Sequence, residues 1–150
     1  MASELTTVRA KPCPTCPYRL DAPSGLWDAS EYEKLSGFDG DVPDQLAAGA
    51  LHVFLCHSTP GFLCAGWVSC HDVDNLLAVR LNHRRIDPAV YEYVSPVPLH
   101  ASGAAAAEHG MRDLPEPGPE ARIAARKLLR QAGRNRRMTT LLTEKDGDDA

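Results

Sequence analysis

Large aliphatic side chains and phenylalanine are scarce in this chain. Leu, Ile, Val and Phe together supply 31 of its 150 residues, only just above the fraction below which a chain usually stays disordered. We therefore expect a small hydrophobic core that needs reinforcement. The length leaves room for one domain of ordinary size, which excludes an enzyme with separate cofactor and substrate domains.

Long apolar segments are also missing. No apolar run approaches the roughly 18 residues that a membrane span needs, and the first ten residues contain no apolar core of signal-peptide length. These absences favour a soluble, cytoplasmic protein with no membrane partner. The five cysteines would then lie in a reducing compartment, where a cysteine cluster is more often a metal site or a catalytic group than a set of disulfides.

Charge is unevenly distributed. The net charge of −4 combines an acidic part, residues 1–119, with a basic part, residues 120–138, that holds seven Lys and Arg against one acidic residue. Residues 139–150 are acidic again. A basic stretch of this kind favours contact with an acidic partner, although a solvated helix face has the same composition.

Composition divides the chain into five parts. We expect a flexible N-terminus over residues 1–10, a cysteine-rich metal-binding domain over 11–95, a Pro/Gly/Ala linker over 96–119, a basic helix over 120–138 and an acidic tail over 139–150. The linker is predicted from five prolines together with glycines and a tract of alanines. The basic helix alternates apolar or small positions with arginines and should end at Gly133.

Local patterns predict a mixed secondary structure. Ser30 is a suitable N-cap with Glu33 at the capping-box position, which predicts a short helix. Leu51–Leu55 has the composition of a strand, and Cys64–Val73 that of a helix. Val90–Val94 fits either a strand or a helical turn. The sequence therefore predicts an α+β class: a small irregular metal-centred domain followed by a C-terminal basic helix.

Four cysteines have spacings that favour one shared site. Cys13 and Cys16 form a C-x-x-C pair, and a tight knuckle turns both thiolates of such a pair to one side. Cys56 and Cys64 are the natural second pair. Seven residues separate them, whereas an ordinary zinc knuckle has two to four, so the pattern is not that of a zinc ribbon.

The spacing of the cysteines favours one metal centre over another only slightly. An iron–sulfur cluster accepts scattered thiolates because the cluster is itself several ångströms across, and a Cys-Pro step, present here at Pro14 and Pro17, is familiar in its binding loops. Cys-Pro steps are also frequent in zinc knuckles, so zinc remains the alternative to the favoured cluster. Aromatic residues within three positions of the candidate ligands either shield such a centre or are ordinary core: Tyr18, Phe54, Phe62 and Trp67.

A redox interpretation competes. Cys13-Pro14-Thr15-Cys16 has the form of the glutaredoxin active site, whose first thiol has a lowered pKa. In that fold the motif opens a helix, whereas here Pro17 follows at once and residues 19–25 have no helical period. Pairs of a cysteine with His57, His71 or His83 can also be drawn, but five cysteines and six histidines permit such pairs in any fold.

Cys70, His57 and His71 are further residues to weigh beside the four cysteines. Four thiolates suffice for either kind of centre, so Cys70 is expected to be a small buried hydrophobe. His57 could complete a site of three cysteines and one histidine, and His71 could belong to the surrounding hydrogen-bond network. Each is equally consistent with an ordinary polar residue.

Three segments carry a resemblance to a known family: Cys13–Arg19 (CPTCPYR), Phe54–Ser58 (FLCHS) and Cys64–Trp67 (CAGW), with Val79–Leu81 further on. They resemble an uncharacterised domain-of-unknown-function family of actinobacteria and their phages, whose members show CPxCP(W/Y)R, FxCHxS and CAGW, and the resemblance spans about residues 11–92. It implies that the cysteines of these motifs act as one unit without Cys70.

The same resemblance adds accompanying residues to the site. It implies that Arg19, His57 and Trp67 surround the unit formed by Cys13, Cys16, Cys56 and Cys64. Similar members often have a histidine where this chain has Asn75, which removes that position as a ligand.

The expected function is a non-enzymatic binding or regulatory module. A four-thiolate centre with a basic arm is similar in layout to the WhiB-like iron–sulfur transcription regulators, although the order of cysteines differs. The expected partner is nucleic acid, or a protein machine bound to it, and a small thiol-redox or electron-transfer protein is the alternative. The candidate nucleic-acid-binding residues are Arg122, Arg126, Lys127, Arg130, Arg134, Arg136 and Arg137.

Overall fold

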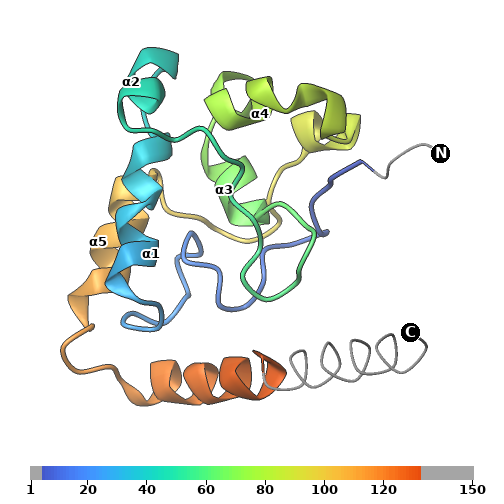
Figure 1. Cartoon of the computed structure of the whole chain (residues 1–150). Coiled ribbons are helices and arrows are strands. Elements are labelled where there is room, and N and C mark those ends of the chain that lie inside the picture. The colour runs from blue at the N-terminus through green and yellow to red at the C-terminus, as the bar shows by residue number, and fades with distance from the viewer. Residues whose placement is uncertain (1–4, 133–150) are drawn as a thin grey trace, which may run out of the picture.

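The chain folds into short helices joined by long irregular segments (Figure 1). The structure is a computed structural model, and it describes residues 5–132. In chain order, with η for a 3₁₀ helix, the elements are α1 (Ala29–Glu33), η1 (Leu35–Phe38), α2 (Val42–Ala47), α3 (Ala65–Cys70), η2 (Val73–Asn75), α4 (Leu77–Leu81), η3 (His83–Arg85), η4 (Pro88–Glu92) and α5 (Gly103–Arg112). Residues 119–132 form a further helix, called here the 119–132 helix.

The α+β prediction is wrong, because the described residues form helices and no sheet. Extended segments meet only as isolated bridges, such as Thr6 with Ile86 and Leu55 with Leu63. The predicted strand Leu51–Leu55 is extended, but it pairs with another segment through Leu55 alone. An apolar run predicts an extended chain, but a sheet also requires a neighbouring segment of matching length, which residues 5–132 do not provide.

The first helix begins earlier than its sequence pattern suggests. The N-cap of α1 is Asp28, not Ser30: its carboxylate accepts hydrogen bonds from the backbone N–H of Ser30 at 3.1 Å and from the Ser30 hydroxyl at 2.6 Å. Both residues are good caps, and the charged acceptor makes the stronger bonds. The helix then ends at Glu33, and the chain continues into η1.

The segment predicted as a linker contains α5, a helix packed on the core. Ala106 and Ala107 of α5 are buried, and α5 lies beside α1 and η1 (Figure 1). A side chain at Gly110 would collide with the ring of Tyr32 in α1. The alanines and glycines that predicted a linker therefore have a packing role: because they are small, two helices can approach each other closely.

Irregular segments complete the domain on the other side. Residues 6–8, predicted as part of a flexible N-terminus, bridge to Ile86 and Leu63, with the Thr6 N–H bonded to the Arg85 carbonyl at 2.7 Å. In the Val90–Val94 segment, which fits either strand or helix by sequence, residues 90–92 belong to η4, and Tyr93 is extended. The predicted acidic tail lies outside the described residues. No helix among residues 5–132 is both long and apolar enough to cross a membrane.

Candidate metal centre

The C-x-x-C segment forms the expected knuckle. The Cys16 N–H donates to the Cys13 carbonyl at 2.9 Å, and the Arg19 N–H donates to the Cys16 carbonyl at 3.1 Å. The Arg19 guanidinium also reaches back to the Pro12 carbonyl at 3.2 Å and forms an ion pair with Asp21. Arg19, predicted to accompany the cysteines, therefore holds the turn that carries Cys13 and Cys16.

The second pair of cysteines is brought together by a closed loop. The Cys56 N–H donates to the Phe62 carbonyl, and the Cys64 N–H donates to the Phe54 carbonyl, each at 2.8 Å. These bonds place the two cysteines at the same end of the 54–64 loop, although seven residues separate them. Cys64 is also the N-cap of α3, where its Sγ accepts a hydrogen bond from the Trp67 N–H at 3.4 Å.

The knuckle and the loop meet through their thiols. The Sγ atoms of Cys16 and Cys64 lie 3.6 Å apart, although the residues are 48 positions apart in the chain. Cys13 affects the pKa of both Cys16 and Cys56, so it lies near both. The four cysteines predicted as ligands therefore lie in one region of the fold, called here the thiol cluster.

Burial and neighbouring thiols favour the neutral form of Cys16 and Cys56. The pKa of Cys56 is raised to about 12 by its interaction with Cys13 and by burial. Cys13 lowers the pKa of Cys16, but the Cys64 thiol and burial together raise it well above its usual value. The glutaredoxin interpretation lacks its helix, since residues 17–28 are irregular.

A glycine allows α3 to approach the knuckle. A Cβ atom at Gly66 would lie 2.5 Å from the Sγ of Cys16 and 2.7 Å from the Cβ of Tyr18. Such contacts are too short for any side chain to be accepted without movement. The glycine of the CAGW motif thus makes room for the sulfur of the other cysteine pair.

Hydroxyl groups lie beside two of the sulfurs. The Thr15 Oγ1 is 3.8 Å from the Cys13 Sγ, and the Ser58 Oγ is 3.6 Å from the Cys56 Sγ. Together with the Trp67 N–H at Cys64, these groups supply donors to thiolates, which is the role of residues that surround metal ligands.

Trp27, which no sequence pattern singled out, ties the knuckle to the loop. Its indole N–H donates to the Thr15 carbonyl, between Cys13 and Cys16, at 2.9 Å. Its ring stacks on the imidazole of His57, next to Cys56, with centroids 4.4 Å apart. Trp27 lies eleven positions beyond the C-x-x-C pair, so spacing in the sequence gave no signal for it.

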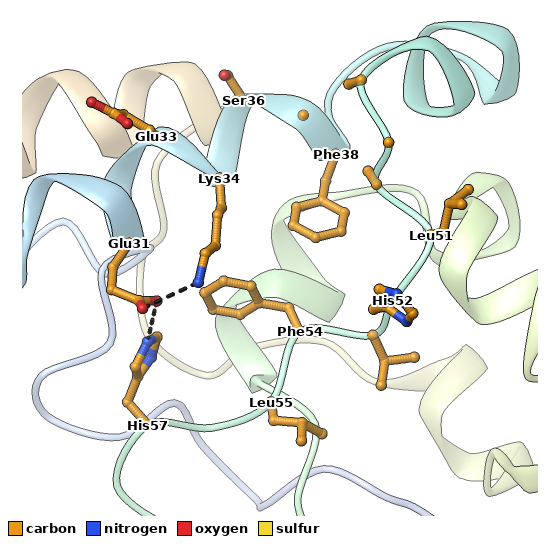
Figure 2. A pocket seen from close by; sticks show the side chains of 15 residues that line it. Glu31, Glu33, Lys34, Ser36, Phe38, Leu51, His52, Phe54, Leu55 and His57 are labelled. Atoms are coloured by element: carbon orange, nitrogen blue, oxygen red, sulfur yellow. Dashed lines mark hydrogen bonds and ion pairs between the residues drawn. The ribbon is translucent and has the colours of Figure 1, made fainter.

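His57 is directed to a carboxylate. Its Nε2 lies 3.0 Å from Glu31, which also accepts from Lys34 at 3.1 Å (Figure 2). The bond from His57, followed by the one from Lys34, lowers the pKa of Glu31 below its ordinary value. His57 thereby fixes the 54–64 loop to α1, beside an open groove of about 580 Å³.

Aromatic residues form one side of the cluster. Tyr18 and Trp67 are fully buried, and edge-to-face contacts link Tyr18 to Phe54 and Trp67 to Phe38. The Tyr18 hydroxyl and the Trp67 indole N–H are buried without a hydrogen-bond partner among the described residues. Phe62, by contrast, is only half-buried.

Cys70 and His71 lie apart from the thiol cluster. The Cys70 Sγ donates to the His100 carbonyl at 3.3 Å, and burial, with the charge of Asp39, raises its pKa to about 12. His71 is 3.6 Å from Asp39, and its burial lowers its pKa. Cys70, which the sequence predicts to be buried, is half-buried and has its own hydrogen bond.

The donor type suits a soft metal, but the four sulfurs do not surround one point. Among residues 5–132, no group of three or more His, Cys, Asp or Glu side chains is arranged to hold a metal ion. Four thiolates on one zinc ion need mutual distances of about 3.8 Å. The Cys16–Cys64 separation of 3.6 Å is close to that value.

The 119–132 helix carries the described part of the predicted nucleic-acid face. Arg122, Arg126, Lys127 and Arg130 are all exposed. The Gln131 side chain donates to the Ser58 carbonyl at 2.9 Å, so the helix contacts the cysteine loop. The remaining candidates lie outside the described residues: Arg134, Arg136 and Arg137.

Comparison with known proteins gives a family without an assigned role. A family model described as a family of unknown function (DUF6283) matches residues 8–132. No curated protein and no solved structure matches the chain. The matched span extends past residue 92, where the motif resemblance ends, and includes α5 and the 119–132 helix.

Proposed function

The chain belongs to the family of unknown function DUF6283, and we propose that it is a metal-centred binding module in which Cys13, Cys16, Cys56 and Cys64 hold an iron–sulfur cluster or a zinc ion. The observation that supports this most is the meeting of four thiols from two segments, with Cys16 and Cys64 only 3.6 Å apart. Reduced thiols gathered in this way are typical of metal sites.

A cluster is favoured over zinc on ligand spacing in the sequence. Seven residues separate Cys56 from Cys64, more than in an ordinary zinc knuckle, and a cluster accepts scattered thiolates. Buried donors without partners, on Tyr18 and Trp67, suit a centre that brings further acceptor atoms into the interior. When bound, either centre would cross-link the knuckle to the 54–64 loop, and a cluster would in addition exchange electrons.

Anaerobic purification followed by metal analysis tests this proposal. We expect a brown protein with visible absorption and stoichiometric iron and sulfide. A colourless protein with stoichiometric zinc would support the zinc alternative. A metal-free protein with a titrating thiol of low pKa would contradict both and support thiol-redox chemistry.

Nucleic acid is the proposed partner of the 119–132 helix. Arg122, Arg126 and Arg130 recur every four residues and therefore lie along one exposed face. Cationic side chains on such a face bind phosphates with release of counterions. The proposal needs a reducing compartment, in keeping with the predicted cytoplasmic location, and the predicted actinobacterial or phage origin is compatible with it.

A DNA- and RNA-binding titration at two salt concentrations tests the partner. We expect salt-dependent binding that weakens strongly in the triple variant Arg122→Glu, Arg126→Glu and Arg130→Glu. The double variant Arg84→Glu and Arg85→Glu is the control, because these exposed arginines lie on η3. Equal loss in both variants, or no binding by the wild type, would contradict the nucleic-acid proposal.

A further inference from the structure

The 119–132 helix lies on the same segments that carry the cysteines. Ala121 is buried, and Ala124, Ala125 and Leu128 are half-buried, so the spacing of the covered positions is that of one helix face. Gln131, one turn further, bonds to the Ser58 carbonyl. The helix therefore faces the domain through small and apolar residues while its arginines remain exposed.

Two clefts flank this contact and define what lies beneath the helix. The first, of about 400 Å³, lies between Trp27, His57 and Pro60 of the domain and Leu128 of the helix. The second, of about 530 Å³, is lined by Pro14, Thr15 and Thr59 opposite Leu128. Leu128 and Gln131 are the helix residues that border both. Thr15 lies inside the C-x-x-C knuckle, His57 directly follows Cys56, and Thr59 lies two positions further on.

Trp27 connects the thiol cluster to this contact. Its indole bonds to Thr15 and its ring stacks on His57, and the same ring lines the first cleft under the helix. The position of the surface beneath the helix thus depends on both cysteine-bearing turns. Those turns contain little regular structure of their own, so a cross-link between them would fix that surface.

The contact between the 119–132 helix and the domain leaves apolar side chains exposed, as expected for a helix that can separate from the domain. Ile123 and Leu129 remain 51% and 67% exposed, and the clefts leave room on both sides of Leu128. Much of the covered face consists of alanines, which bury little area. A segment of this kind opens at low free-energy cost while the core stays folded.

We propose that the 119–132 helix docks on the thiol centre in a metal-dependent way: loading of the centre favours the docked helix, and loss of the metal releases it. This inference rests on the proposed metal site and adds its regulation. By linkage, the docked helix must strengthen metal binding by the same factor with which the metal favours docking. With an unchanged rate of metal capture, the tighter complex loses its metal more slowly.

The first arm of the test measures transfer of the bound metal, iron or zinc as found by metal analysis, from the full chain to a chromogenic chelator. We expect Leu128→Ser to raise the transfer rate at least about fivefold, the lower end of typical coupling between two sites. Leu46→Ser is the matched control, because Leu46 lies on α2, is 62% exposed and borders neither cleft, so its rate should stay within about twofold of the wild type. Gln131→Ala gives a milder second disruption if Leu128→Ser folds poorly.

The second arm measures the reverse effect by limited trypsin cleavage. Cleavage after Arg126 and Lys127 should accelerate when metal is removed, relative to cleavage after the exposed Arg84 and Arg85. The internal reference separates helix release from global unfolding, which would accelerate cleavage at all four residues alike.

The outcomes separate the two proposals. A chain that binds no metal overturns both of them. A chain that binds metal, but whose transfer rate is the same in Leu128→Ser, Gln131→Ala and Leu46→Ser, overturns the coupling and leaves the metal site. Parallel acceleration of trypsin cleavage at Arg84 and Arg126 also overturns it.

Discussion

On the α1–α5 side of the domain, helices meet through small side chains, whereas on the cysteine side irregular turns meet through sulfur. Gly110 against Tyr32, with buried alanines around it, gives the first side close packing without any need for a cofactor. The second side depends on single bridges and on bonds such as Trp27 to Thr15. Under the proposed metal centre, the cysteine side would gain a cross-link, whereas the α1–α5 side relies on packing alone.

The largest effect should come from removing one ligand. Cys56→Ser is expected to lower the free energy of unfolding of the loaded protein by up to the order of 10 kcal/mol, because the binding free energy of a structural centre is also folding free energy. Cys70→Ser should cost far less, since Cys70 makes a single bond to a carbonyl. Thermal melts of both variants check this, and equal losses would show that Cys70 is a ligand or that no centre exists.

Two glycine variants sharpen the comparison between the sides. Gly66→Ala and Gly110→Ala each place a methyl group against a close neighbour, so each should cost about 1–3 kcal/mol. Only Gly66→Ala should also reduce the metal content, because its neighbour is the Cys16 Sγ. Gly118→Ala, which meets nothing within 4 Å, is the control. Reduced metal content in Gly110→Ala would contradict the division into two sides.

A smaller effect is expected at Trp27. Trp27→Phe removes the hydrogen bond to the Thr15 carbonyl but retains a ring against His57, so it should cost about 1 kcal/mol. Trp27→Ala removes both contacts and should cost more. Denaturant unfolding of the loaded chain measures the two steps, and identical losses would show that the indole N–H does not hold the knuckle.

The smallest effect concerns pH. The folded-state pKa of Glu31 is lowered, chiefly by His57, so Glu31 contributes stability above its unfolded pKa near 4.5 and loses it as pH falls through the lower folded value. Glu31→Gln should therefore be less stable than the wild type near neutral pH, and the difference should shrink below about pH 4. Unfolding curves of the wild type and of Glu31→Gln across pH 3–7 test this, with Glu33→Gln as the control. A stability difference between the wild type and Glu31→Gln that stays constant across this range would contradict the prediction.

The cysteine side was easier to foresee than the helical side, for a physical reason. Ligand spacing is a local signal, so Cys13 with Cys16, and the later pair, could be read as one unit before any contact was known. The structure places the Sγ atoms of Cys16 and Cys64, one from each pair, 3.6 Å apart. The sequence did not predict a role for Trp27. That role depends on where two distant turns meet, and the spacing of residues along the chain does not specify this.

The helical side was misread because composition is ambiguous. Alanine and glycine between prolines are typical of linkers, yet in α5 the same residues bring the helix close to Leu35 and Tyr32. For Leu51–Leu55 the sequence predicted a strand. The segment is extended, as its residues favour, but it lacks the pairing of a strand. Pairing depends on a partner segment that no local pattern specifies.

The unequal chain distances between the four thiols set an order of assembly. Cys13 and Cys16 are held in one hydrogen-bonded turn, so they form a local pair that a metal can meet before the rest of the chain has ordered. Joining Cys16 to Cys64 closes a loop of 48 residues, whose entropic cost grows with the logarithm of its length. Once the knuckle holds a metal, binding of the second cysteine pair to that metal is an intramolecular step that closes the loop. The rate of folding should therefore depend on metal concentration.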